Sequence, residues 1–232
     1  MKQNSRHQII LNNLKNYNKV EVDQLSRELN VSEMTVRRDL EKLESEGSLV
    51  RVFGGAIPLQ TNINETPYSD KKIKNITAKK EIAIEALKYV RDNQTIILDS
   101  GTTTYEIANQ LMNLNYQLTI ITNDITICSL LMNSDINVIV LGGQMQNNTG
   151  SVLGSLTYDI VTKLNADLFF LGAHAIDEEF GITAPSIDKA NLKAAMIKAS
   201  KETILVADKS KFNKKTLYKV TDVEQISTII SF

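Results

Sequence analysis

The chain has 232 residues, 42% of them hydrophobic and 23% charged, which suits one large domain or a small domain joined to a medium one. The formal net charge of -1 excludes a globally basic surface, so any contact with nucleic acid must come from a local patch. A single cysteine excludes an intramolecular disulfide, and the apolar neighbours of Cys128 indicate a core residue.

The N-terminal part of the chain predicts three helices. Apolar side chains at helical spacing place the first helix at about residues 6–16 and the second at about 22–29. A turn at residues 30–31 leads to the third helix, for which Ser32 is a suitable N-cap and Gly47 a suitable end. No apolar run approaches the roughly 20 residues of a membrane span and no signal peptide is visible, so we expect a cytoplasmic protein.

The third predicted helix separates an apolar stripe from a polar face. At 100° per residue, the buried side consists of Val36, Leu40 and Leu43. The free side of the first two turns carries Met34, Thr35, Arg37 and Arg38. Arg38 lies nearly opposite the stripe and Arg37 on one flank. Threonine and arginine at the start of the second helix of a helix-turn-helix can meet base edges and phosphates in the major groove.

A strand predicted at 49–52 turns at a glycine pair, which predicts a wing behind the third helix with Arg51 near the DNA backbone. The alternative is a small three-helix bundle whose charged residues lie in water, and charge alone does not decide between them. The arginine pair, the cap, the turn and the glycines together favour DNA binding. The candidate DNA-binding residues are Ser32, Met34, Thr35, Arg37, Arg38, Lys42, Arg51, Gly54 and Gly55.

The pattern Val-Ser-x-x-Thr-Val-Arg-Arg-Asp-Leu-x-x-Leu-Glu-x-x-Gly, followed by Arg-x-x-Gly-Gly-Ala, resembles the winged helix-turn-helix of the DeoR family of bacterial transcriptional regulators. The resemblance covers about residues 3–58 and implies sequence-specific operator binding, usually by a repressor. Phe53 departs from the family pattern, in which a histidine often precedes the glycine pair. We assign residues 1–57 to this domain, with the helix-turn-helix at about 20–39.

Residues 58–74 predict a linker, because they are mostly polar and hold two of the three prolines. Downstream, we expect strands at 95–98, 118–122, 137–141, 167–173 and 203–207, and helices at 78–90, 125–132, 155–164 and 187–201, with one more helix that follows residue 104 and ends at about 112. This alternation predicts an α/β domain over residues 75–232, with a mostly parallel sheet covered on both faces. Ligands in such folds bind at the carboxyl ends of the strands.

The segment Asp99-Ser-Gly-Thr-Thr-Thr104 lies between a predicted strand and a predicted helix, where such a ligand is expected. Gly101 lets the backbone turn sharply, and hydroxyls and free amides at the start of the helix favour a phosphate. The alternative is an ordinary turn in which the threonines cap the helix. Polar loops at 122–123, at 142–143, after Gly172 and at 208–211 follow other strands, and their convergence favours a ligand site.

This half of the chain also resembles the DeoR-type sensor domain, whose fold is similar to ribose-5-phosphate isomerase. The matching segments are Asp-Ser-Gly-Thr-Thr-Thr, Ile-Thr-Asn123, Leu-Gly-Gly143 and Val-Ala-Asp-Lys-Ser-Lys-Phe212. The resemblance implies that a phosphorylated sugar binds here and alters DNA affinity. Asp177 either accepts sugar hydroxyls or only shapes a turn. The candidate effector-binding residues are Asp99, Ser100, Gly101, Thr102, Thr103, Thr104, Asn123, Gly143, Asp177 and Lys211.

The isomerase resemblance offers a competing function, an isomerase-like enzyme fused to a DNA-binding module. That enzyme moves a proton with carboxylates, but its aspartates align on Leu171 and His174, and its glutamate aligns on Lys193. Lysine is a poor base near neutral pH, so we expect no catalytic residues. We instead place Lys193 on a solvated helix face. No metal spacing and no Walker or dinucleotide motif is present, so we expect no metal and no cofactor.

The sequence therefore predicts a repressor of a sugar-metabolism operon that a phosphorylated sugar releases from DNA. The expected partners are a double-stranded DNA operator, the sugar effector and further copies of the chain in a dimer or tetramer, with no membrane. A third possibility is a DNA-binding protein that assembles through its second domain and binds no metabolite.

Overall fold

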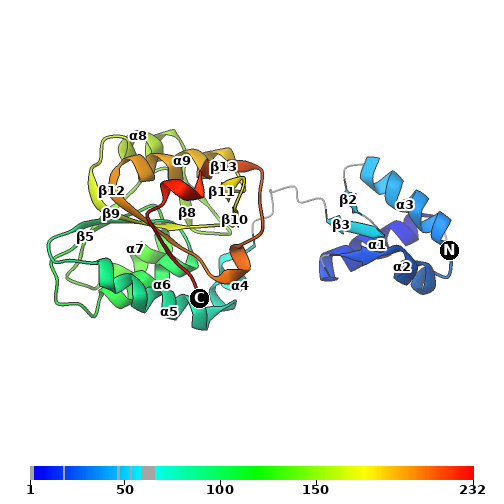
Figure 1. Ribbon diagram of the computed structural model, residues 1–232, viewed down its shortest axis with the longest axis horizontal. Helices are drawn as coiled ribbons and strands as arrows, with labels where there is room; N and C mark the ends of the chain where they lie inside the picture. The colour runs from blue at the N-terminus through cyan, green and yellow to red at the C-terminus, as the bar shows by residue number, and fades with distance from the viewer. Residues whose placement is uncertain (1–2, 18, 46–47, 53, 59–65) are drawn as a thin grey trace. The chain divides into compact units, whose positions relative to one another are not determined.

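The computed structural model describes residues 3–17, 19–45, 48–52, 54–58 and 66–232 (Figure 1). The chain divides into two compact units, Met1–Thr61 and Asn62–Phe232. This division falls inside the segment that the sequence assigned to a linker. Phe53 and Gly47, on which two sequence-based expectations rest, lie outside the described residues.

The described part of the N-terminal unit consists of helices and a small antiparallel sheet. In chain order these elements are α1 (Gln3–Tyr17), β1 (Val20–Glu21), α2 (Val22–Leu29), α3 (Glu33–Ser45), β2 (Leu49–Val52) and β3 (Gly55–Pro58). The strand order is β1-β3-β2. One core joins the helices to the sheet through side chains such as Ile10, Leu25, Leu40 and Leu49. The predicted second helix and the predicted strand at 49–52 are confirmed to the residue.

The C-terminal unit is built on a parallel sheet in the order β14-β12-β9-β4-β5-β6. Its strands are β4 (Thr95–Leu98), β5 (Thr119–Thr122), β6 (Asn137–Val140), β9 (Ala166–Gly172), β12 (Ser200–Val206) and β14 (Thr228–Ile230). The predicted α/β fold with a mostly parallel sheet is therefore confirmed. All of these strands except β14 were predicted within three residues at each end.

Helices cover both faces of this sheet. Along β9, Leu168 and Phe170 pack on one face and Phe169 and Leu171 on the other, as the alternation of a strand requires. One face is covered by α5 (Ile76–Ala86), α6 (Thr102–Leu111) and α7 (Ile125–Leu131), and the other by α8 (Ser155–Val161) and α9 (Ile187–Lys198) (Figure 1). Every strand therefore ends between two helix layers, and its carboxyl end opens toward loops.

Short elements outside the main sheet were not predicted. They are α4 (Tyr68–Ile73), β7 (Gln144–Gln146), β8 (Ser151–Leu153), β10 (Ala175–Asp177), β11 (Gly181–Ala184), β13 (Tyr218–Thr221) and the 3₁₀ turns η1 (Leu87–Tyr89), η2 (Lys209–Lys211) and η3 (Val223–Gln225). The strands pair as β7-β8 and β10-β11-β13, all antiparallel. The helix α4 replaces the last part of the expected linker and is anchored where the Tyr68 amide donates to the Asn148 carbonyl at 2.9 Å.

Among the helices that the structure describes, none is both long enough and apolar enough to cross a membrane. Cys128, which the sequence placed in the core, is only partly buried on α7. Burial nevertheless raises the pKa of its thiol to about 11.

Candidate functional site

The helices α2 and α3 form the helix-turn-helix of the N-terminal unit. Asn30 ends α2 in the left-handed conformation (φ 51°), which turns the chain toward α3. Ser32 then caps α3, because its Oγ accepts from the Thr35 amide at 3.3 Å and lies 3.0 Å from the Thr35 hydroxyl. The predicted N-cap is confirmed, and the hydroxyls of Ser32 and Thr35 are hydrogen-bonded to each other.

The solvent side of α3 carries the candidate base-reading residues. Met34 is 62% exposed, and the exposed side chain of Arg38 has no hydrogen bond or ion pair to any residue that the structure describes. Arg37 differs, because its Nη2 lies 3.2 Å from Oε2 of Glu33 one turn back. Such an exposed pair contributes only about 0.3–0.5 kcal/mol, so a DNA phosphate can displace it. Lys42 is exposed near the other end of α3.

The wing residues have structural partners of their own. Arg51 Nε lies 3.2 Å from Oε2 of Glu44, and the Arg51 amide donates to Oε1 of the same side chain at 2.9 Å. Arg51 therefore fastens β2 to α3, a contact that the sequence did not suggest. Gly55 cannot carry a side chain, because a Cβ would lie 1.9 Å from the Val20 carbonyl oxygen. Gly54 adopts φ +79° and faces open space.

A cavity lies in the C-terminal unit at the carboxyl ends of β4, β5, β9 and β12. The residues at or after the ends of these strands that line it are Asp99, Ser100, Gly101, Thr102, Thr103, Thr104, Asn123, Gly172, Ala173, His174, Asp208, Ser210 and Lys211. Further walls come from Lys71, Lys74, Asn75, Lys79, Ser151, Leu153, Pro185, Lys189, Leu192 and Lys193. The loops after four strands thus meet in one place, as the sequence predicted, whereas the loop at 142–143, which was expected to join them, does not line the cavity.

Lysines dominate the charge of this cavity. Among its lining residues, six are lysines and two are aspartates. Three of the lysines are buried in the protein, with Lys79 4%, Lys189 8% and Lys193 9% exposed. The sequence pointed only to Lys211, because a lysine in a helix or a polar segment usually lies on a solvated face. The cavity is therefore suited to an anion that bears more than one negative charge.

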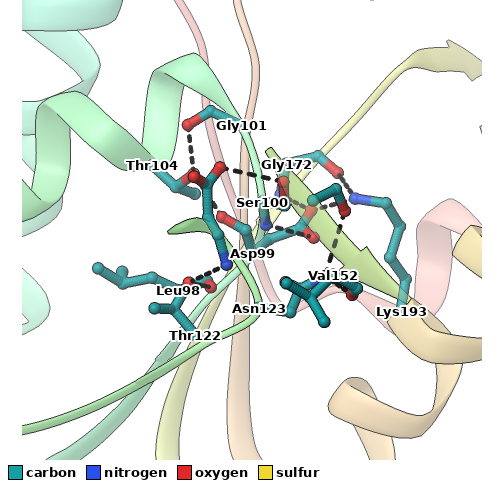
Figure 2. A network of polar contacts seen from close by, with 12 residues as sticks. Leu98, Asp99, Ser100, Gly101, Thr104, Thr122, Asn123, Val152, Gly172 and Lys193 are labelled. Carbon is teal, nitrogen blue, oxygen red and sulfur yellow. Dashed lines mark hydrogen bonds and ion pairs between the residues drawn. The ribbon is translucent and has the colours of Figure 1, made fainter. Parts of the chain in front are cut away.

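The expectation that Lys193 lies on a solvated helix face is wrong. Its ammonium forms an ion pair with the Asp99 carboxylate and donates to the Gly172 carbonyl at 2.9 Å (Figure 2). Asp99 also accepts from the amides of Ser100 and Gly172, each at 2.9 Å. The carboxylate thereby ties the ends of β4 and β9 to α9, and Lys193 lines the cavity at this contact.

The loop from Gly101 to Thr104 divides its polar groups between the fold and the cavity. The Thr104 hydroxyl is buried and lies 2.6 Å from the Asp99 carbonyl and 2.8 Å from that of Gly101 (Figure 2). Thr103 lines the cavity, and its hydroxyl has no hydrogen-bond partner among the described residues. No side chain caps α6, so its first amides remain available as donors. The chain bends at Ser100 and Gly101, but Gly101 itself is extended (φ 167°), which any residue adopts, so this bend does not require a glycine.

Asn123 and Ser100 form the polar wall next to this loop. The Asn123 amide donates to the Val152 carbonyl at 2.9 Å, while its buried Oδ1 has no hydrogen-bond partner in the described part of the chain. Ser100 donates to the Asp124 carboxylate at 3.0 Å. Burial raises the pKa of Asp124, against the hydrogen bonds from Thr126 and Ser100. These contacts join the loop after β4 to the N-terminus of α7.

Two further titratable groups that line the cavity, Lys79 and Asp208, have perturbed pKa values. Burial lowers the pKa of Lys79 to about 8, although the nearby Asp208 carboxylate opposes this effect. The Lys79 ammonium donates to the carbonyls of Lys71 and Lys74, the latter at 2.7 Å. Burial alone would raise the pKa of Asp208, but hydrogen bonds from Ser210 and Asn75 and the charge of Lys211 lower it.

Two of the predicted effector-binding residues do not line the cavity. A Cβ at Gly143 would lie 2.3 Å from Oγ1 of Thr157 and 2.5 Å from the Leu153 carbonyl oxygen, so close packing explains this glycine. Asp177 accepts from the Phe180 amide at 2.8 Å in the turn between β10 and β11. Of the two roles that the sequence allowed for Asp177, this contact matches the turn. The described residues hold no group of three or more acidic, histidine or cysteine side chains that could bind a metal.

A helix-turn-helix unit followed by an α/β unit with a cavity at its strand ends defines a class of transcriptional regulator. Two family models match the chain, the DeoR-like helix-turn-helix domain over residues 6–62 and the DeoR C terminal sensor domain over residues 74–231. The chain belongs to the DeoR family.

Similar proteins carry the names of regulators. The HTH-type transcriptional regulator GlpR of Haloferax volcanii is 32% identical over 90% of this chain and 82% of its own length. The glycerol-3-phosphate regulon repressor of Escherichia coli K12 is 29% identical over 99% of this chain and 90% of its own length. These names are those of DNA-binding regulators and not of enzymes.

Among solved structures, the chain is similar to ribose 5-phosphate isomerase A from Methanocaldococcus jannaschii, at 19% identity with a TM-score of 0.45. The similarity covers 60% of this chain and 55% of that structure.

Proposed function

We propose that this protein represses a sugar-metabolism operon and that a phosphorylated sugar, bound in the cavity of the C-terminal unit, releases it from its operator. The DNA contacts would be made by the solvent side of α3, with Arg38 as the main reader of bases and the wing near the backbone. The protein would act in the cytoplasm, where the operator lies, as a homo-oligomer that pairs its reading helices on repeated half-sites.

The observation that carries this proposal is the charge of the cavity. Six lysines and two aspartates line the cavity, and one of those aspartates is already paired with Lys193. A sugar phosphate carries between about 1.5 and 2 negative charges near pH 7, which suits this excess of cations. The free amides at the start of α6 and the Thr103 hydroxyl supply donors for the phosphate oxygens.

The remaining polar groups suit the sugar part of the ligand. The unpartnered Oδ1 of Asn123 is an acceptor, which a sugar hydroxyl can satisfy after a small local shift. The name of the Escherichia coli relative, a glycerol-3-phosphate regulon repressor, adds support because that metabolite is a phosphate ester with free hydroxyls.

The position of α4 suggests how binding reaches the DNA-binding unit. This helix follows the segment between the two units, and its residue Lys71 lines the cavity. Its carbonyls at Lys71 and Lys74 are held by the Lys79 ammonium. Tyr68 packs edge-on against Tyr105 of α6, with ring centroids 6.3 Å apart. A phosphate that draws the Lys79 ammonium toward itself would weaken the hold on α4, and a coupling of about 1–3 kcal/mol would suffice for regulation.

A thermal-shift screen of the full-length protein tests the ligand. Each phosphorylated sugar would be compared with its unphosphorylated parent, on the wild type and on Thr103→Val. We expect at least one phosphorylated sugar to raise the melting temperature, its parent to have no effect, and Thr103→Val to reduce the shift. Thr162→Val, at the C-terminal end of α8, is the matched control and should respond as the wild type. If no phosphorylated sugar raises the melting temperature, the proposed effector site is refuted.

A further inference from the structure

A buried carboxylate lies beside the apolar stripe of the reading helix. Asp39 is 1% exposed, and the buried residues next to it on α3 are Val36, Leu40 and Leu43. The sequence placed the three apolar residues in the core and assigned nothing to Asp39. A carboxylate inside a protein is strongly unfavourable unless it is paired and hydrogen-bonded, so its partners matter.

Two side chains from the start of α1, Arg6 and His7, contact Asp39. Arg6 makes a two-pronged contact, with Nε 2.7 Å from Oδ2 and Nη2 3.0 Å from Oδ1. The Nε2 atom of His7 lies 3.2 Å from Oδ1. The Arg6 side chain is only 12% exposed, so this cation of the DNA-binding unit is directed into the protein. It holds α3 rather than a phosphate.

A two-pronged contact constrains α3 in a way that its apolar contacts do not. The guanidinium and the carboxylate must lie in one plane with two parallel hydrogen bonds, which fixes both the rotation of the helix and its position along its axis. Apolar attraction has no preferred direction, so it fixes the rotation of a helix less sharply. Asp39 directly follows Arg38 on the same rigid helix. Fixing the position of Asp39 therefore also fixes the direction in which the Arg38 side chain leaves the helix.

We propose that the Arg6–Asp39 pair is a positioning element for DNA recognition, which sets the rotation and axial position of α3 without touching DNA. This inference rests on the proposed reading face of α3 but not on the proposed effector. Its physical consequence is specific: loss of the pair should reduce discrimination between DNA sequences while the general attraction to phosphates remains.

The decisive variant replaces both charges with apolar side chains of similar size, Arg6→Met together with Asp39→Leu. Such replacement of a buried ion pair commonly keeps or raises stability. A pair that only held the domain together would therefore be dispensable in this variant. A positioning pair would not be, because Met and Leu restore burial but not the planar contact.

The assay uses the full-length protein and two fluorescent duplexes. One is selected by the wild-type protein from a randomised pool, and the other has the same composition in scrambled order. Fluorescence anisotropy gives both affinities, and hydrogen exchange of peptides from α1 and α3 reports whether the domain is folded. We expect the amides of both helices in the double variant to stay protected from hydrogen exchange. We also expect this variant to bind the scrambled duplex as the wild type does. Its preference for the selected duplex should fall by about tenfold or more.

The control breaks an exposed pair in the same unit. Asp23→Asn removes the contact between Asp23 and Arg27 Nη2 at 3.0 Å on α2, and should change neither protection nor preference. If the double variant is folded and keeps the wild-type preference, the inference is refuted. If it fails to fold, Arg6→Lys decides, because lysine keeps the charge but not the two-pronged contact. A folded Arg6→Lys protein with unchanged preference would equally refute it, whereas a reduced preference would support it.

The test separates this inference from the function on which it rests. Arg38→Ala should remove the preference without altering the Arg6–Asp39 contact. If Arg38→Ala keeps the full preference, the reading face is wrong. If it loses the preference while the folded double variant retains it, only the positioning role fails.

Discussion

The affinity for a phosphorylated sugar should fall as the pH rises above 8, because Lys79 then loses its charge. Burial lowers the pKa of this lysine from 10.5 to about 8, and the side chain lies in the cavity wall. A neutral amine still has two N–H groups to donate to the carbonyls of Lys71 and Lys74. Deprotonation should therefore remove the charge that attracts the ligand and leave the local fold intact.

The size of the effect follows from the pKa. The second pKa of a phosphate monoester is about 6, so the charge of the ligand changes little between pH 7.5 and 9. With a pKa of about 8, the charged fraction of Lys79 falls from roughly three quarters at pH 7.5 to roughly one tenth at pH 9. The predicted loss of affinity is about eightfold, or ~1.2 kcal/mol, if binding requires the charged form.

Calorimetry in two buffers of different ionisation enthalpy tests this directly. Because the bound phosphate raises the pKa of Lys79, binding at pH 9 should take up close to one proton per ligand, and binding at a pH well below 8 should take up almost none. Lys79→Arg keeps its charge in this range and should show neither the proton uptake nor the loss of affinity. A wild-type protein whose affinity is constant from pH 7.5 to 9, with no proton uptake, would show that the charge of Lys79 does not contribute to binding.

Three substitutions test other parts of the structure. Lys193→Met should lower the free energy of unfolding by about 3 kcal/mol in urea denaturation, because Asp99 would stay buried without its cation. The loss should be smaller when Asp99→Asn is added. An unchanged denaturation midpoint for Lys193→Met would contradict the pairing. Arg38→Ala should weaken binding to a selected duplex by about 1–3 kcal/mol in anisotropy titrations while the far-ultraviolet circular dichroism is unchanged. Gly55→Ala places a Cβ 1.9 Å from the Val20 carbonyl oxygen, so the amides of the wing should lose hydrogen-exchange protection. Unchanged protection would show that β1 and β3 can accommodate the methyl group without losing their pairing.

The sequence could predict the main sheet because its strands are compact apolar runs. The run at 95–98 is buried on both faces, and its bounds agree with β4 to the residue. The short antiparallel strands could not be predicted in this way. Gln144–Gln146 is a polar three-residue segment, and it becomes a strand only by pairing with Ser151–Leu153. The same holds for α4, whose six residues have no buried face and read as a polar linker.

The buried charges could not be predicted for a related reason. The local composition around these charges, which are Lys79, Lys193 and Asp39, is typical of solvated helix faces. Periodicity shows only which residues lie on the same face of a helix. Their burial depends on partners far along the chain, since Lys193 pairs with Asp99 and Asp39 with Arg6. The loop at Asp99–Thr104 was predictable because its position after a strand and before a helix is itself the signal.

The most direct test of the central claim is the effect of ligand on DNA affinity. Anisotropy titrations of the full-length protein on its selected duplex would be repeated at saturating concentrations of each sugar phosphate that raises the melting temperature. We expect at least one of them to weaken DNA binding by about 5- to 150-fold, and its unphosphorylated parent to leave it unchanged. A sugar phosphate that saturates the cavity and leaves the operator affinity unchanged would contradict this expectation.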